Sequence, residues 1–295
     1  MTGFLEIEGL NVTLGRDGPR LLRDVSLTVQ RQEVHGLVGE SGAGKSMIGK
    51  AIAGLLPRAV HVASGAIRLD GQDLFTMRPA ARRRLIGART AIIPQDPLTA
   101  LNPCRRIAGQ ITDRLVRTLG WPAAKASARA RELLDEVHIR DPDRVLRSYP
   151  HELSGGMRQR VLIAAAFAAE PELIIADEPT TALDVTVQKQ ILRLIAEMQH
   201  RHHTAMLFVT HDMGVVAKIC QNVSVLYAGK VMHRGSAQAL FSGAETHPYA
   251  DALIAATPRF DRPEQSLLPV PRTVIDALDA EIARDDAAWE AADAA

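Results

Sequence analysis

Cysteine, net charge and long apolar runs are all scarce in this sequence, and each scarcity excludes a class of protein. The two cysteines, Cys104 and Cys220, are too few for a cysteine-based metal site or a disulfide framework, and they suit a reducing cytoplasm. The formal net charge is only +1, so bulk electrostatics gives no reason to expect nucleic acid or membrane lipid as a partner. No apolar run approaches the roughly 18 residues of a membrane-spanning helix, and the first residues lack the basic and apolar segments of a secretory signal. We therefore expect any role at a membrane to depend on a partner.

One stretch, Gly39–Ser46, organises the rest of the chain, because it reads Gly-Glu-Ser-Gly-Ala-Gly-Lys-Ser and fits G-x-x-x-x-G-K-[ST], the phosphate-binding P-loop. The apolar run at 34–38 predicts a buried parallel strand before it, and apolar residues at helical spacing predict a helix over 47–56 after it. In that context the glycines expose backbone N–H groups to a phosphate, Lys45 can reach the β- and γ-phosphates, and the Ser46 hydroxyl can ligate Mg²⁺. A glycine-rich turn that fits the pattern by chance is the alternative. The residues expected to bind nucleotide are Gly39, Glu40, Ser41, Gly42, Ala43, Gly44, Lys45 and Ser46.

Strand and helix patterns place this motif in a larger α/β arrangement. Residues 4–30 alternate apolar and polar side chains around a turn at 15–19, and residues 62–74 form a further strand and hairpin around Asp70-Gly71. These segments predict a small antiparallel sheet that flanks the P-loop core. Residues 105–147 instead have apolar side chains at helical spacing, which predicts an all-helical insert between sheet segments.

A second glycine pair, Gly155-Gly156, follows Ser154 at the start of another predicted helix. Ser154 suits an N-cap position, and the two glycines leave the backbone N–H groups of the helix start uncovered, as in an anion site. Two phosphate-binding elements in one chain make sense if the second contacts a nucleotide that another subunit holds. A simple helix cap is the alternative interpretation.

Polar residues follow three further apolar strands, at the edge where ligands bind in open α/β sheets. Asp177 and Glu178 follow the run at 173–176. A carboxylate there can hold Mg²⁺ with the P-loop hydroxyl, and the next carboxylate can take a proton from an attacking water. His211 follows another run, where it can donate a hydrogen bond to a γ-phosphate, and Gln95 follows a third. Taken singly, the acidic pair and the glutamine could be ordinary surface residues and the histidine a structural one.

The C-terminal part of the chain differs in composition from the rest. His247-Pro248-Tyr249 predicts the start of a short helix, whereas the cluster from His200 to His203 is interpreted as the solvated, charged end of a helix rather than as a metal site. The acidic, alanine-rich segment 275–295 either docks on a neighbour or remains a frayed helix, and docking is the favoured interpretation. Its apolar face comprises Ile275, Leu278, Ile282 and Trp289. An extended linker before it is marked by Pro258, Pro263, Pro269 and Pro271.

Taken together, over about residues 4–255, these motifs resemble the ATP-binding cassette (ABC) ATPases. The matching segments are Gly39–Ser46 (P-loop), Gln95 (Q-loop), Leu153–Gln159 (signature), Leu173–Glu178 (Walker B), Ala182–Asp184 (D-loop) and His211 (switch histidine). Finer features are similar to the peptide/nickel importer subfamily, namely Gln95–Pro103, Leu153–Arg160, Glu178–Val187 and His247–Tyr249. The chain departs from that family at Leu14, where an aromatic residue usually stacks on adenine. The absence of any cysteine after Cys220 excludes the C-terminal iron–sulfur centre of some relatives.

The resemblance implies an α/β fold, with a P-loop NTPase (ABC ATPase) core, an antiparallel β subdomain and an inserted α-helical subdomain. The expected division is 1–95 for the β subdomain and the P-loop core, 96–160 for the helical signature subdomain, 161–240 for the remainder of the RecA-like core and 241–295 for a C-terminal extension.

The resemblance also implies an ATPase that acts as a head-to-tail pair, in which each ATP lies between the P-loop of one subunit and the signature of the other. ATP and Mg²⁺ are the expected cofactors. Glu178 is the expected catalytic base, and His211 and Gln95 are expected to orient the reacting groups. Further nucleotide contacts are expected from Ser154, Gly155, Gly156 and Asp184, and Mg²⁺ ligands from Ser46, Gln95 and Asp177.

The same resemblance implies an importer of peptides or similar small solutes, powered by this subunit. The expected partners are a second ABC ATPase subunit (a paralogue by family analogy, or a second copy), two transmembrane permease subunits and, indirectly, an extracytoplasmic solute-binding protein. No nucleic-acid partner is expected. The expected location is peripheral, on the cytoplasmic face of the inner or plasma membrane.

Three other functions compete with import. An ABC ATPase of nucleic-acid repair would carry a long coiled coil, zinc modules or a second cassette, whereas here only Met47–Glu152 lies between P-loop and signature. A small-molecule P-loop kinase would leave Ser154–Met157 unexplained. An assembly or regulatory cassette without membrane partners, for example in cofactor assembly, remains an open alternative.

Overall fold

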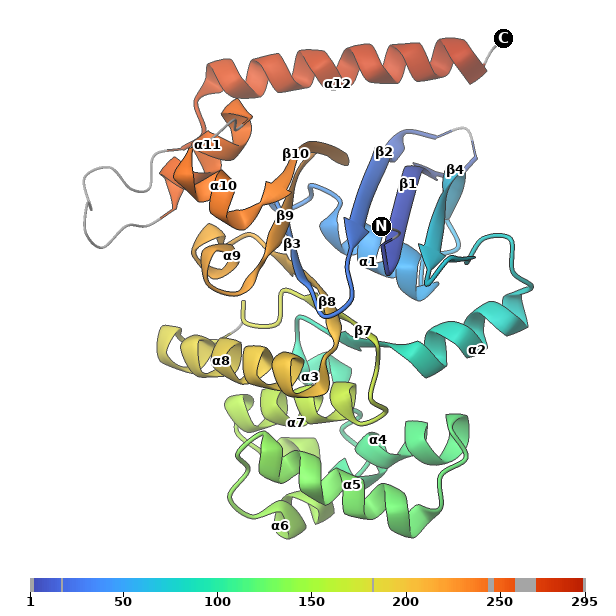
Figure 1. Cartoon of the computed structure of the whole chain (residues 1–295), viewed down its shortest axis with the longest axis vertical. Helices are drawn as coiled ribbons and strands as arrows, with labels where there is room; N and C mark the ends of the chain where they lie inside the picture. The colour runs from blue at the N-terminus through green and yellow to red at the C-terminus, as the bar shows by residue number, and fades with distance from the viewer. Residues whose placement is uncertain (1–2, 17, 182, 244–246, 258–268, 294–295) are drawn as a thin grey trace. The chain divides into compact units, whose positions relative to one another are not determined.

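The computed structural model describes residues 3–16, 18–181, 183–243, 247–257 and 269–293 (Figure 1). Ala182 of the predicted D-loop and the predicted linker prolines Pro258 and Pro263 lie outside these ranges. The chain divides into two compact units. Unit 1 comprises Met1–Gln30, Val34–Thr76 and Val209–Ala295, and unit 2 comprises Arg31–Glu33 and Met77–Phe208. The predicted subdomain limits remain predictions.

Unit 1 contains the predicted antiparallel sheet. Its strands are β1 (Leu5–Leu14), β2 (Arg20–Val29), β4 (Val60–Leu69) and β5 (Gln72–Asp73), in the order β2-β1-β4-β5. Leu5 lies opposite Val29 on one side and Leu69 on the other. The turn between β4 and β5 has φ values of 52° at Asp70 and 74° at Gly71, the signs that a two-residue hairpin turn of type I′ needs. The sheet prediction is therefore confirmed.

Unit 1 also carries the elements around the P-loop. They are β3 (Val34–Val38), α1 (Lys45–Ala53), β9 (Asn222–Tyr227) and β10 (Lys230–Ser236). Strand β3 is buried throughout and runs parallel to β9, which pairs antiparallel with β10. The helix ends earlier than the predicted 47–56, because Gly54 adopts a left-handed conformation with φ of 68° and caps α1. Leu55, expected on the helix, consequently lies beyond it with 59% of its surface exposed.

The C-terminal part of unit 1 is helical and packs on the chain itself. Its helices are α9 (Met213–Ile219), α10 (Ala237–Ser242), α11 (Pro248–Ala256) and α12 (Arg272–Asp293), the last drawn above β10 and β2 in Figure 1. Leu278 of α12 joins a buried apolar cluster with Val38, Val225 and Tyr249. Ile282, from the same predicted apolar face, is 9% exposed. The predicted apolar face thus docks within this chain, so the frayed alternative is wrong for the described part of α12.

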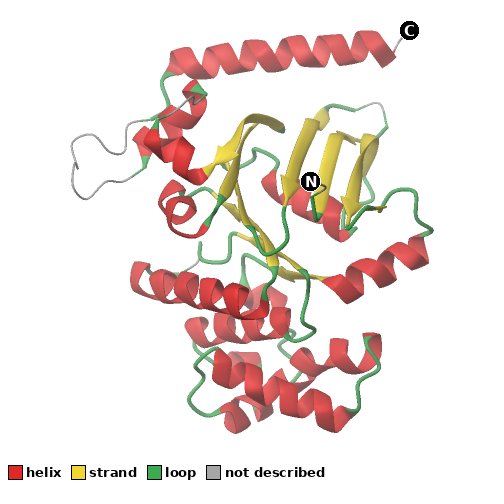
Figure 2. Ribbon diagram, in the orientation of Figure 1, coloured by secondary structure: helices red, strands yellow, loops and turns green. Residues whose placement is uncertain are grey.

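Unit 2 combines three strands with a set of helices (Figure 2). Strands β8 (Ala205–Thr210), β7 (Leu173–Asp177) and β6 (Thr90–Ile93) lie in that order, and Ile93 is opposite Ala176 in the parallel pair β6–β7. The last two residues of β8 belong to unit 1. The helices are α2 (Pro79–Arg89), α3 (Pro97–Ala100), α4 (Ile107–Asp113), the π-helical turn η1 (Arg114–Thr118), α5 (Ala123–Glu136), α6 (Pro142–Arg147), the 3₁₀ turn η2 (Pro150–Glu152), α7 (Gly155–Phe167) and α8 (Val185–His202).

The helical insert is confirmed, and its apolar spacing becomes a core. Ile107, Ile111 and Leu115 are almost fully buried, as are Leu133 and Leu134 of α5. Burial of such aliphatic side chains stabilises each by roughly 1.5–3 kcal/mol relative to exposure. Among the residues that the structure describes, no helix combines the length and apolar character needed to cross a bilayer.

The histidine cluster at the end of α8 differs from its prediction in one respect. His202 is not solvated: its side chain is 12% exposed, and its Nε2 lies 2.8 Å from the Glu136 carboxylate. Burial favours the neutral form of Glu136. The hydrogen bond with His202 and the charges of His202, Arg129 and Arg201 outweigh that effect and lower the pKa of Glu136. This cluster stabilises the packing of α5 against α8.

Candidate functional site

The P-loop of unit 1 is wrapped around the ammonium group of Lys45. Lys45 is the first residue of α1 and only 4% exposed, and its Nζ donates hydrogen bonds to the carbonyl oxygens of Gly39 and Glu40, both at 2.8 Å. A buried ammonium is stable only with such partners, because burial without them costs several kcal/mol. The positive charge is therefore held under the loop, within reach of an anion placed on it.

The start of α1 is built to receive an anion. The N-cap residue is Gly44, which has φ of 97° and brings no side chain that could cap the helix. The positive φ favours glycine here, and a Cβ would also lie 2.8 Å from Cδ2 of Leu22, which would have to shift. Since the first N–H groups of a helix need an acceptor, a phosphate oxygen fits this position.

The β9–β10 hairpin supports the P-loop from the side. Gly229, in the turn of the hairpin, donates its N–H to the carbonyl oxygen of Ala43 at 2.9 Å. Gly39 lies so close to β9 that a Cβ would be 2.3 Å from the carbonyl oxygen of Leu226. The P-loop conformation therefore depends on a distant hairpin, because Gly229 follows Ala43 by nearly 190 residues in the chain. Local sequence patterns carry no signal for this contact.

Tyr249, from the predicted His-Pro-Tyr helix start, is a part of this support that sequence reasoning missed. Its side chain is fully buried in α11, and its ring meets that of Tyr227 edge-on with centroids 5.1 Å apart. Burial and the nearby charge of Glu40 raise the pKa of the Tyr249 phenol, so it remains neutral beside the P-loop. The sequence signal is limited to the His-Pro-Tyr motif, which predicts a helix start and not this contact.

Unit 2 holds the predicted acidic pair at the carboxyl end of β7. Asp177 is the last residue of the strand, and Glu178 follows it with φ of 45°, a left-handed conformation that a residue with a side chain seldom adopts. Both residues are half-buried. The Thr181 hydroxyl donates to Oε2 of Glu178 at 2.9 Å. Thr181 thus orients the carboxylate, a role that sequence reasoning did not assign.

Gln95 lies at the same sheet edge of unit 2 as the acidic pair. Because Ile93 lies opposite Ala176 in the parallel pair β6–β7, Gln95 and Glu178 are both two residues beyond that matched position. Gln95 is exposed. The structure therefore brings these two predicted residues to one sheet edge, where carboxylate and amide oxygens are also suitable Mg²⁺ ligands.

The signature residues of unit 2 form an accessible helix start. Ser154 caps α7, and its Oγ accepts a hydrogen bond from the N–H of Met157 at 3.3 Å, so the predicted N-cap is confirmed. Ser154 and Gly155 are exposed. A Cβ at Gly155 would meet nothing within 4 Å, so packing inside this chain does not require glycine there. The absence of a side chain instead leaves the helix start open to another molecule.

The remaining predicted residues lie at element ends. Asp184 caps α8, because its Oδ1 accepts from the N–H groups of Thr186 at 3.1 Å and Val187 at 2.9 Å. His211 directly follows β8 and is exposed, in unit 1 with the P-loop. Leu14 ends β1 with 48% of its surface exposed.

The donor set fits the expected cofactors. The glycine-rich loop with Lys45 supplies N–H and ammonium donors for a triphosphate. Ser46, Gln95 and Asp177 offer only oxygen ligands, the type that Mg²⁺ prefers. Unit 1 carries the P-loop and His211, and unit 2 carries Gln95, the acidic pair and the signature.

Comparison with known proteins agrees with the nucleotide-binding site described above. The ABC transporter family model matches residues 22–181. The chain is 43% identical over 273 residues to the dipeptide transport ATP-binding protein DppD of Escherichia coli, covering 92% of this chain and 83% of that protein. It is 46% identical, with the same coverage, to the probable D,D-dipeptide transport ATP-binding protein DdpD of E. coli. Among solved structures, cbiO1 from Clostridium perfringens, part of the ABC transporter complex cbiONQ, is similar with a TM-score of 0.71 and 27% identity, over 82% of this chain and 92% of that one.

Proposed function

Because the chain belongs to the ABC transporter family, whose ATP-binding subunits hydrolyse ATP, we propose that it powers an importer for peptides or similar small solutes. Support comes from relatives named as dipeptide transport ATP-binding proteins at 43% and 46% identity. The observation that carries the proposal is the buried Lys45 ammonium under a glycine-capped helix start.

The proposed site is completed by a second subunit. The signature helix start of unit 2 is exposed at Ser154 and Gly155, and no contact within 4 Å explains the glycine. A phosphate group of a nucleotide bound to another P-loop would supply the acceptor that such a helix start needs. Two chains arranged head to tail would then enclose each nucleotide. The second chain is a paralogue or a further copy of this one.

The proposed reaction is attack of water on the γ-phosphate of ATP. The P-loop N–H groups and Lys45 would hold the β- and γ-phosphates. Glu178, oriented by the Thr181 hydroxyl, would accept the proton from the attacking water. His211 and Gln95 would orient the water and the phosphate. Mg²⁺, held by Ser46 and Asp177 with Gln95, would neutralise the charge that develops on the phosphate oxygens.

The proposed partners are membrane subunits. Closure and opening of the nucleotide-bound pair would act on two permease subunits, which receive solute from an extracytoplasmic binding protein. The chain would lie on the cytoplasmic face of the membrane as a peripheral subunit. Co-purification from membranes with permease subunits attached is the expected result. Recovery with soluble proteins and no permease would contradict the import role.

Replacement of Glu178 by glutamine tests the proposed mechanism. The variant keeps the size and most hydrogen bonds of the side chain but cannot accept the proton. We expect MgATP binding to persist, hydrolysis to fall by about 10² to 10⁴, and closed pairs to accumulate. Glu197→Gln, at an exposed position of α8 in the same unit, is the matched control. Turnover near that of the control would contradict the assignment of the base.

A further inference from the structure

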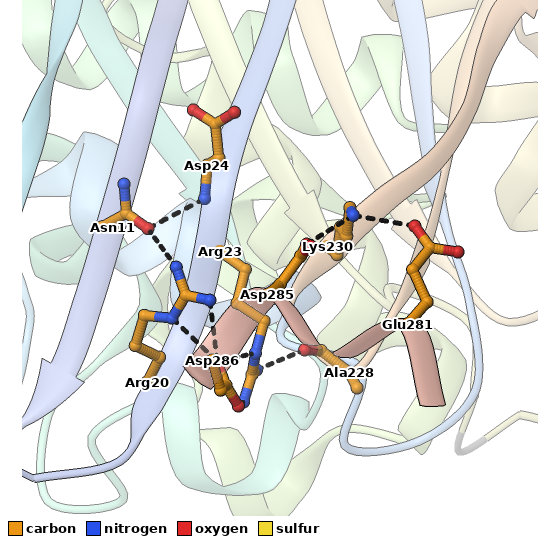
Figure 3. Close-up of polar contacts among 9 residues, drawn as sticks. All are labelled: Asn11, Arg20, Arg23, Asp24, Ala228, Lys230, Glu281, Asp285 and Asp286. Carbon is orange, nitrogen blue, oxygen red and sulfur yellow. Dashed lines mark hydrogen bonds and ion pairs between the residues drawn. The ribbon is translucent and has the colours of Figure 1, made fainter. Parts of the chain in front are cut away.

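Helix α12 is bound to β2 through one carboxylate that accepts from two arginines (Figure 3). Oδ1 of Asp286 accepts from Nε of Arg20 at 2.8 Å and from Nε of Arg23 at 2.9 Å, and Oδ2 accepts from Nη2 of Arg23 at 2.7 Å. The two arginine side chains are only 8% and 12% exposed. A bidentate pair between partly buried groups is held more firmly than an exposed surface pair.

The same helix is bound to the β9–β10 hairpin at two further points. Nζ of Lys230, the first residue of β10, donates to Glu281 at 2.8 Å and to Asp285 at 2.5 Å. The hydroxyl of Tyr227, the last residue of β9, donates to Asp279 at 2.7 Å. Burial and this hydrogen bond raise the pKa of Tyr227 to about 12, so the hydroxyl remains a donor at neutral pH. Four acidic residues of α12 therefore converge on one hairpin and the strand beside it.

Arg23 carries this contact on to the turn that supports the P-loop. Its Nη1 donates to the carbonyl oxygen of Ala228 at 2.5 Å. Its backbone N–H donates to the carbonyl oxygen of Gly229 at 2.8 Å. Gly229 in turn donates to the carbonyl oxygen of Ala43 in the P-loop. Asp286 and Ala43 are thus linked through one arginine and one turn (Figure 3 shows the arginine and Ala228).

An aromatic contact runs parallel to this ionic one. Tyr227, held by Asp279, packs edge-on against the fully buried Tyr249, which lies beside Glu40 of the P-loop. Leu278, one residue before Asp279, is buried in the cluster that contains Tyr249. The supported loop therefore connects to α12 at two points, Glu40 and Ala43.

We propose that α12 is a clamp that holds the β9–β10 turn, and through it the P-loop, in the conformation that binds ATP. Its positioning residues are Asp286, Asp279, Glu281 and Asp285, which act through Arg23, Lys230 and Tyr227. The inference deepens the proposed function, since it assigns the C-terminal helix a role in nucleotide affinity. A loosened clamp raises the KM for ATP and leaves kcat nearly unchanged, because the acidic pair and the signature belong to the other unit.

The test uses the full-length chain with Asp286→Asn, which keeps the shape of the side chain and removes its charge. We expect the KM for ATP to rise about fivefold or more with kcat within about twofold of the parent, in line with typical coupling between distinct sites. Amide hydrogen exchange of residues 39–46, measured without nucleotide, is expected to become faster. Asp286→Glu restores the charge and is expected to recover most of the parent KM. Asp276→Asn, an exposed position one turn before Asp279, is the control.

Two outcomes separate this inference from the proposed function. If Asp286→Asn leaves both the KM and the exchange of residues 39–46 at control values, the clamp is overturned while ATP hydrolysis by the P-loop stands. If Lys45→Ala retains full ATP binding, the proposed site fails, and the hydrogen exchange still reports whether α12 holds the loop. If Asp286→Asn lowers kcat by as large a factor as it raises the KM, the inference is also overturned, because that result would indicate a general structural defect.

Discussion

Gln159 donates its side-chain N–H to the carbonyl oxygen of Pro179 at 2.8 Å, and neither residue is exposed. The first lies on α7, the helix that begins at Gly155, and the second directly follows Glu178. Within unit 2, this bond joins the segment that would contact a second subunit's nucleotide to the segment that carries the proposed base, Glu178. A shift of α7 would therefore move the backbone beside Glu178.

Replacement of Gln159 by leucine tests that connection. The change leaves the buried carbonyl of Pro179 without its donor, which costs about 1–3 kcal/mol in the free energy of unfolding. We expect kcat for ATP hydrolysis to fall more than the affinity for ATP, because the P-loop belongs to the other unit. Steady-state kinetics and denaturant unfolding measure both effects, with Gln190→Leu, exposed on α8, as the control. An unchanged kcat in a destabilised protein would show that the bond is structural only.

Lys45→Ala tests the anion-binding role of the P-loop. The lysine makes charge-assisted hydrogen bonds worth roughly 1.5–3 kcal/mol each to a charged partner, so we expect ATP affinity to fall about tenfold to a hundredfold. Titration with a fluorescent ATP analogue measures the loss. Lys50→Ala removes the same charge from an exposed position of α1 and serves as the control. Equal affinities in the two variants would contradict the role of Lys45.

We expect the docking of α12 to depend on pH through Asp286. Burial favours the neutral acid, but the hydrogen bonds and charges of Arg23 and Arg20 outweigh it and lower the pKa of Asp286 below its ordinary value of 3.8. A carboxyl group whose pKa is lower in the folded protein contributes stability above its unfolded pKa, and this contribution is lost as the pH falls through the folded value. We therefore expect α12 to loosen below about pH 4.

Trp289 on α12 reports this transition, since it lies against the Arg20 guanidinium, 5.0 Å from the ring centroid. Trp121→Phe leaves it as the single tryptophan, because the chain has two. Its fluorescence is expected to shift to the red as the pH falls, and to be shifted already at neutral pH in Asp286→Asn. An identical acid transition in the variant would show that other groups control docking.

Much of the fold and of the site was predictable because it depends on short-range patterns. Ser154 caps α7 and the Asp70-Gly71 turn joins two strands, as their local chemistry predicted. The α/β fold with its antiparallel sheet and helical insert is confirmed by the likeness to solved ABC cassettes. The end of α1 was missed, although Gly54 is a recognisable stop signal.

Other parts of the site depend on side chains that meet only in the folded chain. The bond from Thr181 to Glu178 occurs together with a left-handed backbone at Glu178, which no propensity indicates. The apolar face of α12 was visible in the sequence, but the surface that covers it was not. An amphipathic pattern indicates that the apolar face of a helix will be buried, and it does not identify the surface on which the helix packs. Asp286 meets Arg23 across a sequence separation of 263 residues.

By itself, the amino-acid sequence determined the phosphate-binding loop, the acidic pair at the end of a buried strand and the capped glycine pair. Each of these is encoded within a few residues by backbone freedom and hydrogen-bonding chemistry. Only the tertiary structure decided what supports the loop: the hairpin turn at Gly229, the buried Tyr249 and the acidic face of α12. Such contacts join distant segments, and their energy comes from burial and charge pairing that exist only once the chain is folded.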